Sequence, residues 1–331
     1  IENRVDAVLF AGDAYRSRDP SLTYQREFSR RLSRLASSGV VVALLIGNHD
    51  LPNGIGKATP LDIYETLTIE RIHVFAVPTT QTVQTRGGPL QIVAMPWVRR
   101  EGMFTAEMLR TKSADEIDLE LNEMLGTWIG DQVASLDPTV PAILMAHASI
   151  AGATFGSERK VLLGRDLVLT GSSVDRHEFS YVAMGHIHKH QRLGAITPVV
   201  YSGSTERIDF GEEREDKGFI EITIGAPREA ADVRFRQLPT RPFRTVQVQL
   251  GDGDPTEQVL DSIRRQSVEG TVLRVVVEST ADQYRALRRN DIAAASRTAH
   301  FFAGIQQKVI DDGRQPERGS GVEELTVQEI L

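Results

Sequence analysis

The sequence predicts an α/β fold in which a two-layered β-sandwich is flanked by helices and followed by a small α/β module. Short apolar runs such as 40–46 are typical of strands that are covered on both faces of a sheet. Amphipathic segments with helical periodicity stand between these runs. Near residues 240–243 the pattern restarts after the stretch Pro-Thr-Arg-Pro, which predicts a boundary between two domains.

The first elements are expected to form a strand–helix–strand unit. Residues 5–11 have the apolar character of a buried strand, and residues 22–36 repeat apolar side chains at helical spacing. Ser21 is the expected N-cap of this helix, and Gly39 is expected to end it. The apolar run 40–46 then completes a βαβ unit.

The following segments continue the same alternation. A strand-rich stretch covers 72–97, and one or two helices are expected within 105–135. Further strands are predicted at 141–146, 181–184 and 197–202, and a closing hairpin at 217–224 and 233–238. Loops at one rim of this sandwich are expected to carry the chemistry.

The predicted domain boundaries follow from this change of pattern. Residues 1–240 are expected to form the larger domain and residues 244–310 the smaller one, with a linker at 311–331. Within the smaller domain, strands are predicted at 244–250 and 271–278, and helices at 256–267 and 281–296. It carries no cluster of ligand-type residues, so the chemistry is assigned to the larger domain.

Composition excludes several classes of function. The 331 residues contain no cysteine, which removes disulfides, thiolate metal sites and cysteine nucleophiles, and fits a reducing cytosol. No apolar run reaches the roughly 18 residues that a membrane span needs. The net charge of −7 argues against a nucleic-acid partner, but it includes any carboxylates that hold cations.

Polar residues of the metal-ligand type follow four of the predicted strands. Asp13 comes after the first strand and Asn48 after the second. His147 follows a later strand, and His186 and His188 follow the next one. Two imidazoles one residue apart, directly after a buried strand, are poor core residues and suit a metal ion. The repeated pattern of strand end and ligand predicts one metal centre.

The types of these residues indicate a dinuclear hydrolase. Two cations roughly 3.5–4 Å apart need a bridging carboxylate, for which Asp13 is the candidate. Mixed nitrogen and oxygen ligands without sulfur suit Mn, Fe, Zn or Co. His49 adjoins a ligand, as expected of a general acid that protonates a leaving alkoxide. Asp50 is predicted to orient His49 as a neighbouring carboxylate.

Other histidines are interpreted as structural. The motif at 175–177 has the Asp-x-His form of a ligand pair but stands in a polar connection before a strand. His190 is expected at the surface, and His73 and His300 carry no partner signal. Trp97 fits either the rim of a substrate site or the core.

The ordered set of ligand-type residues resembles the calcineurin-like metallophosphoesterase superfamily. Segments 201–213 and 216–219 are similar to those of the DNA double-strand-break repair nucleases, and within these to the nuclease subunits of the bacterial SbcC–SbcD complexes. The resemblance extends over nearly the whole chain, and the module after residue 243 is similar to the capping domain of that family.

The resemblance implies a role for each candidate residue. Asp13 would bridge two Mn²⁺ ions, and His49 would be the catalytic histidine rather than a ligand. One metal site would be completed by Asn48, His147 and His186, whereas His188 would belong to the other.

The resemblance also implies an activity and partners. We expect a cytoplasmic, Mn-dependent nuclease that acts as a 3′→5′ double-strand exonuclease and as an endonuclease in DNA repair, recombination and replication. The expected substrates are double-stranded DNA ends and hairpins. The expected assembly is a homodimer with an ATPase subunit of the SMC type, SbcC, towards which the linker 311–331 would lead. No membrane partner is expected.

One departure from the family leaves alternatives open. The first strand of the family ends in Asp-x-His, which supplies two further ligands, and this motif does not occur before Asp13. Since the chain opens on Ile1, we expect that strand to precede it. The first alternative is a metallophosphoesterase acting on nucleotides or phosphoproteins. The second is a DNA-end-binding scaffold whose metal site is incomplete.

Overall fold

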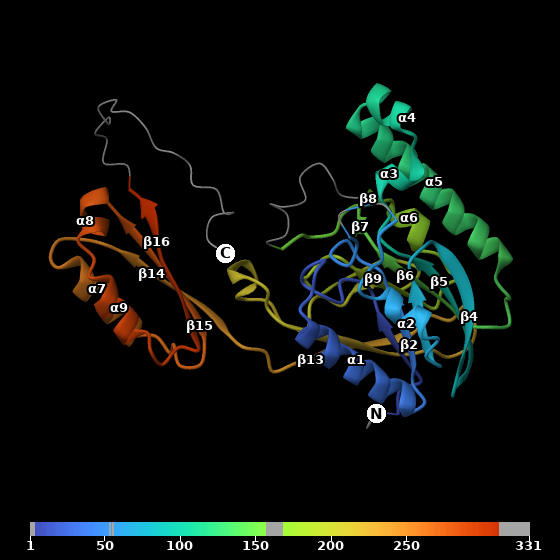
Figure 1. Ribbon diagram of the computed structural model, residues 1–331, viewed down its shortest axis with the longest axis horizontal. Helices are drawn as coiled ribbons and strands as arrows, with labels where there is room; N and C mark the ends of the chain where they lie inside the picture. Colours follow the sequence, from blue (N-terminus) through green and yellow to red (C-terminus); the bar gives the residue numbers. More distant parts are fainter. Residues whose placement is uncertain (1–3, 53, 55, 157–167, 311–331) are drawn as a thin grey trace. The chain divides into compact units, whose positions relative to one another are not determined.

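The computed structural model describes residues 4–52, 54, 56–156 and 168–310, which form two compact units (Figure 1). The first unit is Ile1–Thr240 and the second is Arg241–Leu331. The predicted linker 311–331 lies outside the described residues. Within the described ranges, no helix is both long enough and apolar enough to span a membrane.

Two sheets form the centre of the first unit. The smaller sheet is parallel and has the order β1–β2–β3, with β1 (Ala7–Phe10), β2 (Val41–Leu45) and β3 (Ile72–Phe75). The larger sheet has the order β10–β11–β9–β6–β5–β4 and is mixed. Its strands are β4 (Thr79–Thr85), β5 (Gly88–Met95), β6 (Ala142–His147), β9 (Tyr181–Gly185), β10 (Gln191–Leu193) and β11 (Val199–Tyr201).

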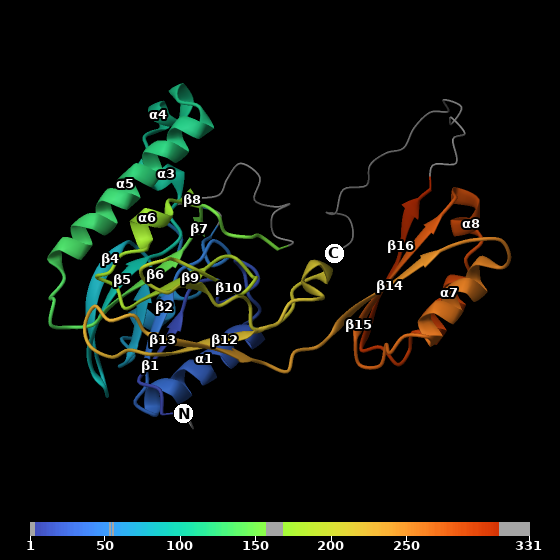
Figure 2. The same cartoon turned by 180° about the vertical axis from the view of Figure 1, so that it is seen from behind.

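Helices and short pairings complete the first unit. The helices are α1 (Leu22–Ser37), α2 (Asp62–Thr66), α3 (Arg100–Met103), α4 (Ala106–Thr111), α5 (Ala114–Ser135) and α6 (Gly171–Val174), with a 3₁₀ turn, η2 (Phe210–Glu212). The short strands β7 (Ser149–Ile150) and β8 (Val168–Leu169) pair with each other. The predicted closing hairpin is confirmed as β12 (Gly218–Thr223) and β13 (Asp232–Gln237), which Figure 2 shows from behind.

Alternating side chains build a four-layered structure from the two sheets. In β2, Ala43 packs between the sheets with Ile143 of β6, whereas its neighbour Leu44 packs on the side of α1. In β6, Leu144 packs on the side of α5. Because successive side chains of a strand point to opposite faces, each central strand contributes to two apolar cores. The prediction of a two-layered sandwich flanked by helices is therefore confirmed.

The predicted first helix is confirmed with its caps. Ser21 accepts a hydrogen bond from the backbone N–H of Tyr24, and Gly39 has a φ of +82°, which ends the helix in the left-handed region. Within the predicted helical region, α5 begins with a capping box between Ser113 and Glu116. The ends of α1 could thus be predicted from the residues at its ends alone.

The second unit is a parallel three-stranded sheet with helices. It consists of β14 (Phe243–Gln249), α7 (Pro255–Arg264), β15 (Val272–Ser279), α8 (Ala281–Arg285), α9 (Arg289–Ala295) and β16 (Phe301–Val309), with β15 in the middle of the sheet. The single helix predicted at 281–296 is wrong, since the chain turns at Arg288 between α8 and α9. The sequence did not predict β16, because a register shift beside Gly304 (φ +101°) breaks its alternation of apolar side chains.

Candidate metal centre

The loops after β1 and β2 are tied together by two acidic side chains. Asp13 lies in the loop after β1, in the left-handed region (φ 56°), and its Oδ1 accepts the backbone N–H of His49 at 2.8 Å. The N–H of Asp13 in turn donates to Oδ2 of Asp50 at 2.8 Å. These two hydrogen bonds hold the loop after β1 against the loop after β2, in which Asn48 directly precedes His49.

Asp50 is fully buried and holds backbone groups of both loops. Its carboxylate accepts the N–H of Gly47 at 2.9 Å and that of Tyr15 at 3.4 Å, in addition to that of Asp13. Burial raises the pKa of Asp50 to about 6, although the hydrogen bond from Gly47 favours the charged form. All these hydrogen bonds go to backbone groups, so orientation of the His49 ring by Asp50 stays a prediction.

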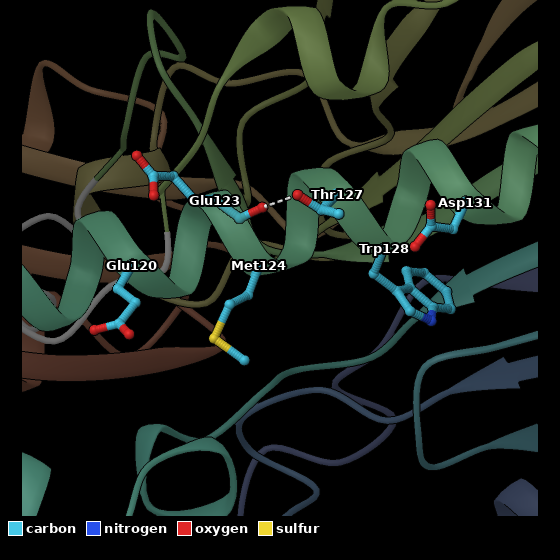
Figure 3. A pocket seen from close by; sticks show the side chains of 6 residues that line it. All are labelled: Glu120, Glu123, Met124, Thr127, Trp128 and Asp131. Carbon is cyan, nitrogen blue, oxygen red and sulfur yellow. Dashed lines mark hydrogen bonds between the residues drawn. The ribbon is translucent and has the colours of Figure 1, made fainter.

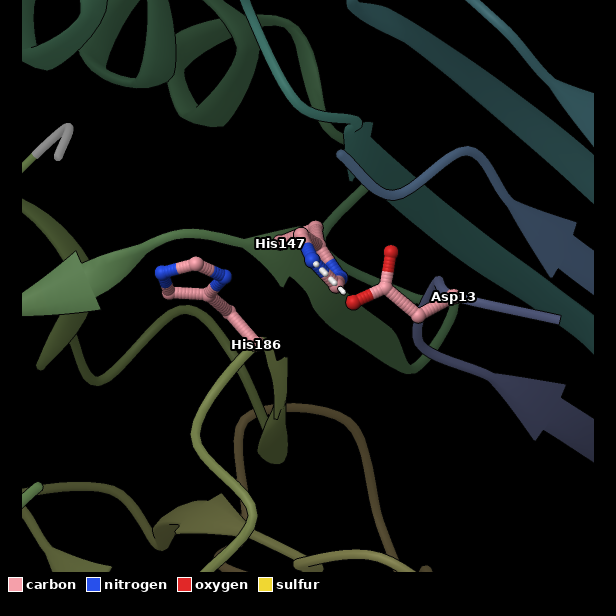
Figure 4. Close-up of side chains that lie close together, drawn as sticks. All are labelled: Asp13, His147 and His186. Carbon is pink, nitrogen blue, oxygen red and sulfur yellow. Dashed lines mark ion pairs between the residues drawn. The ribbon is translucent and has the colours of Figure 1, made fainter. Parts of the chain in front are cut away.

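Four of the predicted ligands converge on one point. Oδ1 of Asn48 lies 2.9 Å from Nε2 of His147 and 3.0 Å from Nδ1 of His186. Nε2 of His147 is also 3.3 Å from Oδ2 of Asp13. One ligand atom from each of Asp13, His147 and His186 lies within 4.8 Å of the others, and Figure 4 shows these three side chains. The structure thus assembles residues that are far apart in the chain, such as Asn48 and His186, which are 138 positions apart.

The tautomer of His147 suits a cation at this point. Nδ1 of His147 lies 2.7 Å from the carbonyl oxygen of Ala11, which can only accept, so Nδ1 carries a proton. In the neutral ring, Nε2 then presents its lone pair toward the oxygens of Asn48 and Asp13. Three electron-rich atoms at such distances need a positive charge between them, from either a proton or a metal ion. The donor set therefore fits a divalent metal.

Asp13 and His147 each stabilise the charged form of the other. Burial would raise the pKa of Asp13, but the neighbouring His147 lowers it to about 2. Burial would lower the pKa of His147, but the Asp13 carboxylate raises it above its ordinary value. Asp13 is consequently ionised at neutral pH, as a metal ligand must be.

Glycines at the strand ends allow the ligand-bearing loops to approach each other. A Cβ on Gly12 would lie 2.1 Å from Nδ1 of His147, and one on Gly47 would lie 2.2 Å from Oδ1 of Asp13. A Cβ on Gly185 would lie 1.7 Å from the carbonyl oxygen of Ala11. Only glycine fits these positions without displacing a ligand or the backbone beside it.

Trp97 packs on the imidazoles of two predicted ligands. Its ring centroid lies 4.9 Å from that of His186 at an interplanar angle of 38°, and 6.1 Å from that of His147. Its backbone N–H donates to the carbonyl oxygen of Ile46, at the end of β2. The aromatic ring thereby limits the rotation of His186.

His188 lies outside this group but has a carboxylate partner that the sequence did not reveal. Its Nδ1 is 2.8 Å from Oε1 of Glu212, which is fully buried. Burial would raise the pKa of Glu212, but hydrogen bonds from His188 and Lys217 lower it to about 2. The only sequence signal was the similarity of segment 201–213 to a nuclease family, which does not distinguish Glu212 from its neighbours.

Outside the candidate site, Asp175, His190 and His73 have structural partners, and His190, which was expected at the surface, is half-buried. Asp175 accepts the backbone N–H groups of a turn at 195–197 and so shapes a loop. His190 stacks on Phe235 with centroids 4.3 Å apart. His73 lies 3.1 Å from the Gln81 side chain through Nδ1.

A surface hollow on the outer side of α5 contains none of the predicted site residues. Figure 3 shows the six residues that line it, which are Glu120, Glu123, Met124, Thr127, Trp128 and Asp131. They all come from one helix, and three of them are acidic. The ligand-type residues instead gather where the strands of the two sheets end.

Comparison with known families agrees with this arrangement. The family model of the calcineurin-like phosphoesterases matches residues 1–190, which include every predicted ligand and His49. The chain belongs to the calcineurin-like phosphoesterase family. This family and its fold imply divalent metal ions, and the group of Asp13, His147 and His186 is where this phosphoesterase offers ligands for one.

The phosphoesterase is also similar, along most of its length, to subunits of the nuclease SbcCD and to DNA double-strand break repair proteins. It is 27% identical to the SbcD subunit of the nuclease SbcCD of Bacillus subtilis over 70% of this chain and 59% of that protein. It is 28% identical to the DNA double-strand break repair protein Mre11 of Haloferax volcanii over 95% of this chain and 61% of that protein. The identity to the SbcD subunit of Rhodobacter capsulatus is 24% over 80% of this chain and 67% of that protein. The chain thus spans about three fifths of the length of the first two relatives.

Proposed function

We propose that this phosphoesterase is a Mn-dependent DNA nuclease that hydrolyses phosphodiesters as a 3′→5′ double-strand exonuclease and as an endonuclease. The observation that carries the proposal is the convergence of Asp13, Asn48, His147 and His186 in a chain similar to SbcD and Mre11 proteins. Relatives named for nuclease activity and for double-strand-break repair favour DNA over other phosphoesters.

The ligand set is proposed to hold two Mn²⁺ ions. Asn48, His147 and His186 would complete one position, Asp13 would bridge, and His188 would serve the second position. Divalent ions bound there would polarise the scissile phosphate and provide a nucleophile at neutral pH. The neutral amide oxygen of Asn48 holds a cation without reducing its net charge.

His49 is proposed to move the proton in this reaction. Its backbone N–H is fixed on Asp13, whereas the residue itself is exposed, so the ring can approach a bound phosphodiester. An imidazole at this place would protonate the departing oxygen as a general acid. His49 thus acts on the substrate, and the buried residues around it hold the metal.

The second unit and the partners belong to the same proposal. We propose that 1–240 is the nuclease domain and that 244–310 is a capping domain that contacts the DNA backbone. Such contacts are electrostatic and read little sequence. A homodimer with an SMC-type ATPase such as SbcC is the proposed assembly, because relatives carry the name of the SbcCD complex.

The experiment that tests this function is cleavage of linear double-stranded DNA by the full-length protein, with Mn²⁺ and with EDTA. Mn-dependent loss of nucleotides from the ends is the expected result. The variant His147→Ala should no longer release nucleotides, because it lacks a proposed metal ligand. His177→Ala, at an exposed histidine outside the site, should leave it unchanged.

Two other outcomes would replace the proposal. Hydrolysis of a small phosphodiester or a nucleotide without cleavage of DNA would make the protein a nucleotide-directed phosphoesterase. Hydrolysis of neither substrate, also in the presence of the ATPase partner, together with DNA-end binding, would make it a scaffold.

A further inference from the structure

A buried pair of opposite charges lies against His188, outside the group of Asp13, His147 and His186. The side chains of Glu212 and Lys217 have no exposed surface, and Nζ of Lys217 lies 2.7 Å from Oε2 of Glu212. Transferring two charges into the interior costs several kcal/mol per ion, so a buried pair contributes little net stability. Its place beside a predicted metal ligand indicates another role.

The two oxygens of Glu212 have separate partners. Oε1 lies 2.8 Å from Nδ1 of His188. Oε2 is surrounded by the ammonium of Lys217, the backbone N–H of Ile208 at 3.1 Å and the hydroxyl of Ser204 at 3.4 Å. With so many donors the carboxylate is an acceptor only, so the shared proton belongs to Nδ1 of His188. The neutral ring then carries its lone pair on Nε2, the form in which an imidazole binds a metal.

The same segment also holds the backbone of His188. Its carbonyl oxygen accepts from Nζ of Lys217 and from the N–H of Ser204, both at 3.0 Å. Gly203 has a φ of +76°, and a Cβ there would lie 2.7 Å from that carbonyl oxygen. Ring and backbone of His188 are thus fixed by one stretch of chain.

We propose that Glu212, supported by Lys217, is a positioning residue that sets the tautomer and the ring orientation of His188 and so prepares the second metal position. The inference rests on the proposed function, because it gives His188 a cation to bind. Lys217 compensates the charge of Glu212 in the interior. Glu215 also binds Lys217, at 2.8 Å, but has no hydrogen bond to the His188 ring among the described residues, which makes it a matched control.

The first measurement is the tautomer of His188 in metal-free, full-length protein labelled with ¹⁵N at histidine. Long-range ¹H–¹⁵N spectra distinguish a proton on Nδ1 from one on Nε2, and a His188→Gln variant assigns the signal. The wild type and Glu215→Gln should show the proton on Nδ1. The double variant Glu212→Leu with Lys217→Met removes both charges together, so no lone charge stays buried, and should lose this preference.

The second measurement is the Mn²⁺ stoichiometry of the same proteins by calorimetry. The wild type and Glu215→Gln should bind two ions, whereas the double variant should bind the second ion about 10–100-fold more weakly. A double variant with the wild-type tautomer and two tight ions would overturn the inference. Wild-type protein that binds two ions as described but cleaves no DNA would instead contradict the proposed function alone.

Discussion

Neighbouring residues in the loop after β2 have different environments. His49 is exposed, whereas Asp50 beside it is fully buried and accepts backbone N–H groups from both ligand loops. Asn48 points its amide oxygen at two imidazoles. Under the proposed function, Asn48 would hold the metal and His49 would act on the substrate, whereas Asp50 holds the two loops together. Substitutions should therefore separate these effects.

His49→Ala should keep metal binding and lose most turnover. The exposed ring contributes no ligand atom to the group around Asn48, and removal of a general acid costs a factor of about 10²–10⁴. Calorimetry with Mn²⁺ and steady-state kinetics on DNA would measure the two effects, with His177→Ala as the control. Full activity in the His49 variant would remove this residue from the mechanism.

Glu212 should make the metal-free protein sensitive to acid. The pKa of Glu212 is lowered from 4.5 to about 2, so its contribution to stability is present above pH 4.5 and is lost as the pH falls toward 2. The melting temperatures of wild type and Glu212→Gln should accordingly differ most at neutral pH and converge near pH 2. A difference that stays constant with pH would contradict the charged state assigned to Glu212.

At the scale of secondary-structure elements, glycines allow the ends of three strands to pack closely together. The ends of β1, β2 and β9 approach so closely that a Cβ on Gly185 would overlap the carbonyl oxygen of Ala11. The pairing of β6 with β9 continues as far as His147 and Gly185. This register fixes how far along the two strands His147 and the neighbouring His186 lie. The packing of the strand ends, rather than any single contact, thus determines the spacing of the predicted metal ligands.

Gly185→Ala should separate the strand ends and weaken metal binding. Inserting a methyl group into a packed site typically costs about 1–3 kcal/mol, and here the shift falls on the loop that carries Asp13. Gly102→Ala is the control, since no atom lies within 4 Å of its added Cβ. Urea unfolding and Mn²⁺ calorimetry would compare both. Unchanged metal affinity in the Gly185 variant would show that the strand ends can adjust.

At the scale of the whole molecule, exposed apolar side chains on two adjoining helices of the first unit offer a test of the proposed homodimer. Tyr64 of α2 is hydrogen-bonded to Ser29 of α1, so the two helices adjoin. Large apolar side chains on these helices are exposed, namely Leu22, Tyr24, Ile63 and, directly after α2, Leu67. A homodimer interface that covered some of these side chains would bury apolar surface.

Leu22→Asp combined with Ile63→Asp should shift the protein from dimer to monomer. In a symmetric interface the new carboxylates of one subunit would face those of the other and repel them. The interface would also lose the apolar area that Leu22 and Ile63 bury. Sedimentation equilibrium would measure the association constant, and Val309→Asp, at an exposed apolar residue of the second unit, is the control. A dimer of unchanged strength would place the interface on another surface.

The sequence alone predicted which strand ends carry ligand-type residues and that the fold is that of a phosphoesterase. Apolar runs that end in Asp13, Asn48, His147 and His186 are local patterns, and parallel strands bring their carboxyl ends to the same edge of a sheet. The alternation within the central strands similarly determined the flanked sandwich. Both predictions depend on short-range periodicity, which a single sequence contains.

Only the tertiary structure decided which side chains support the ligands. Glu212 and His188 are 24 residues apart, Asp50 joins a loop 37 residues away, and neither pair has a periodic signal. Likewise, β16 was not predicted, because its irregular register is set by pairing with β15. Such contacts are determined by how the sheets and loops pack, because the hydrogen-bond needs of buried polar groups are met by whichever chain segment lies beside them.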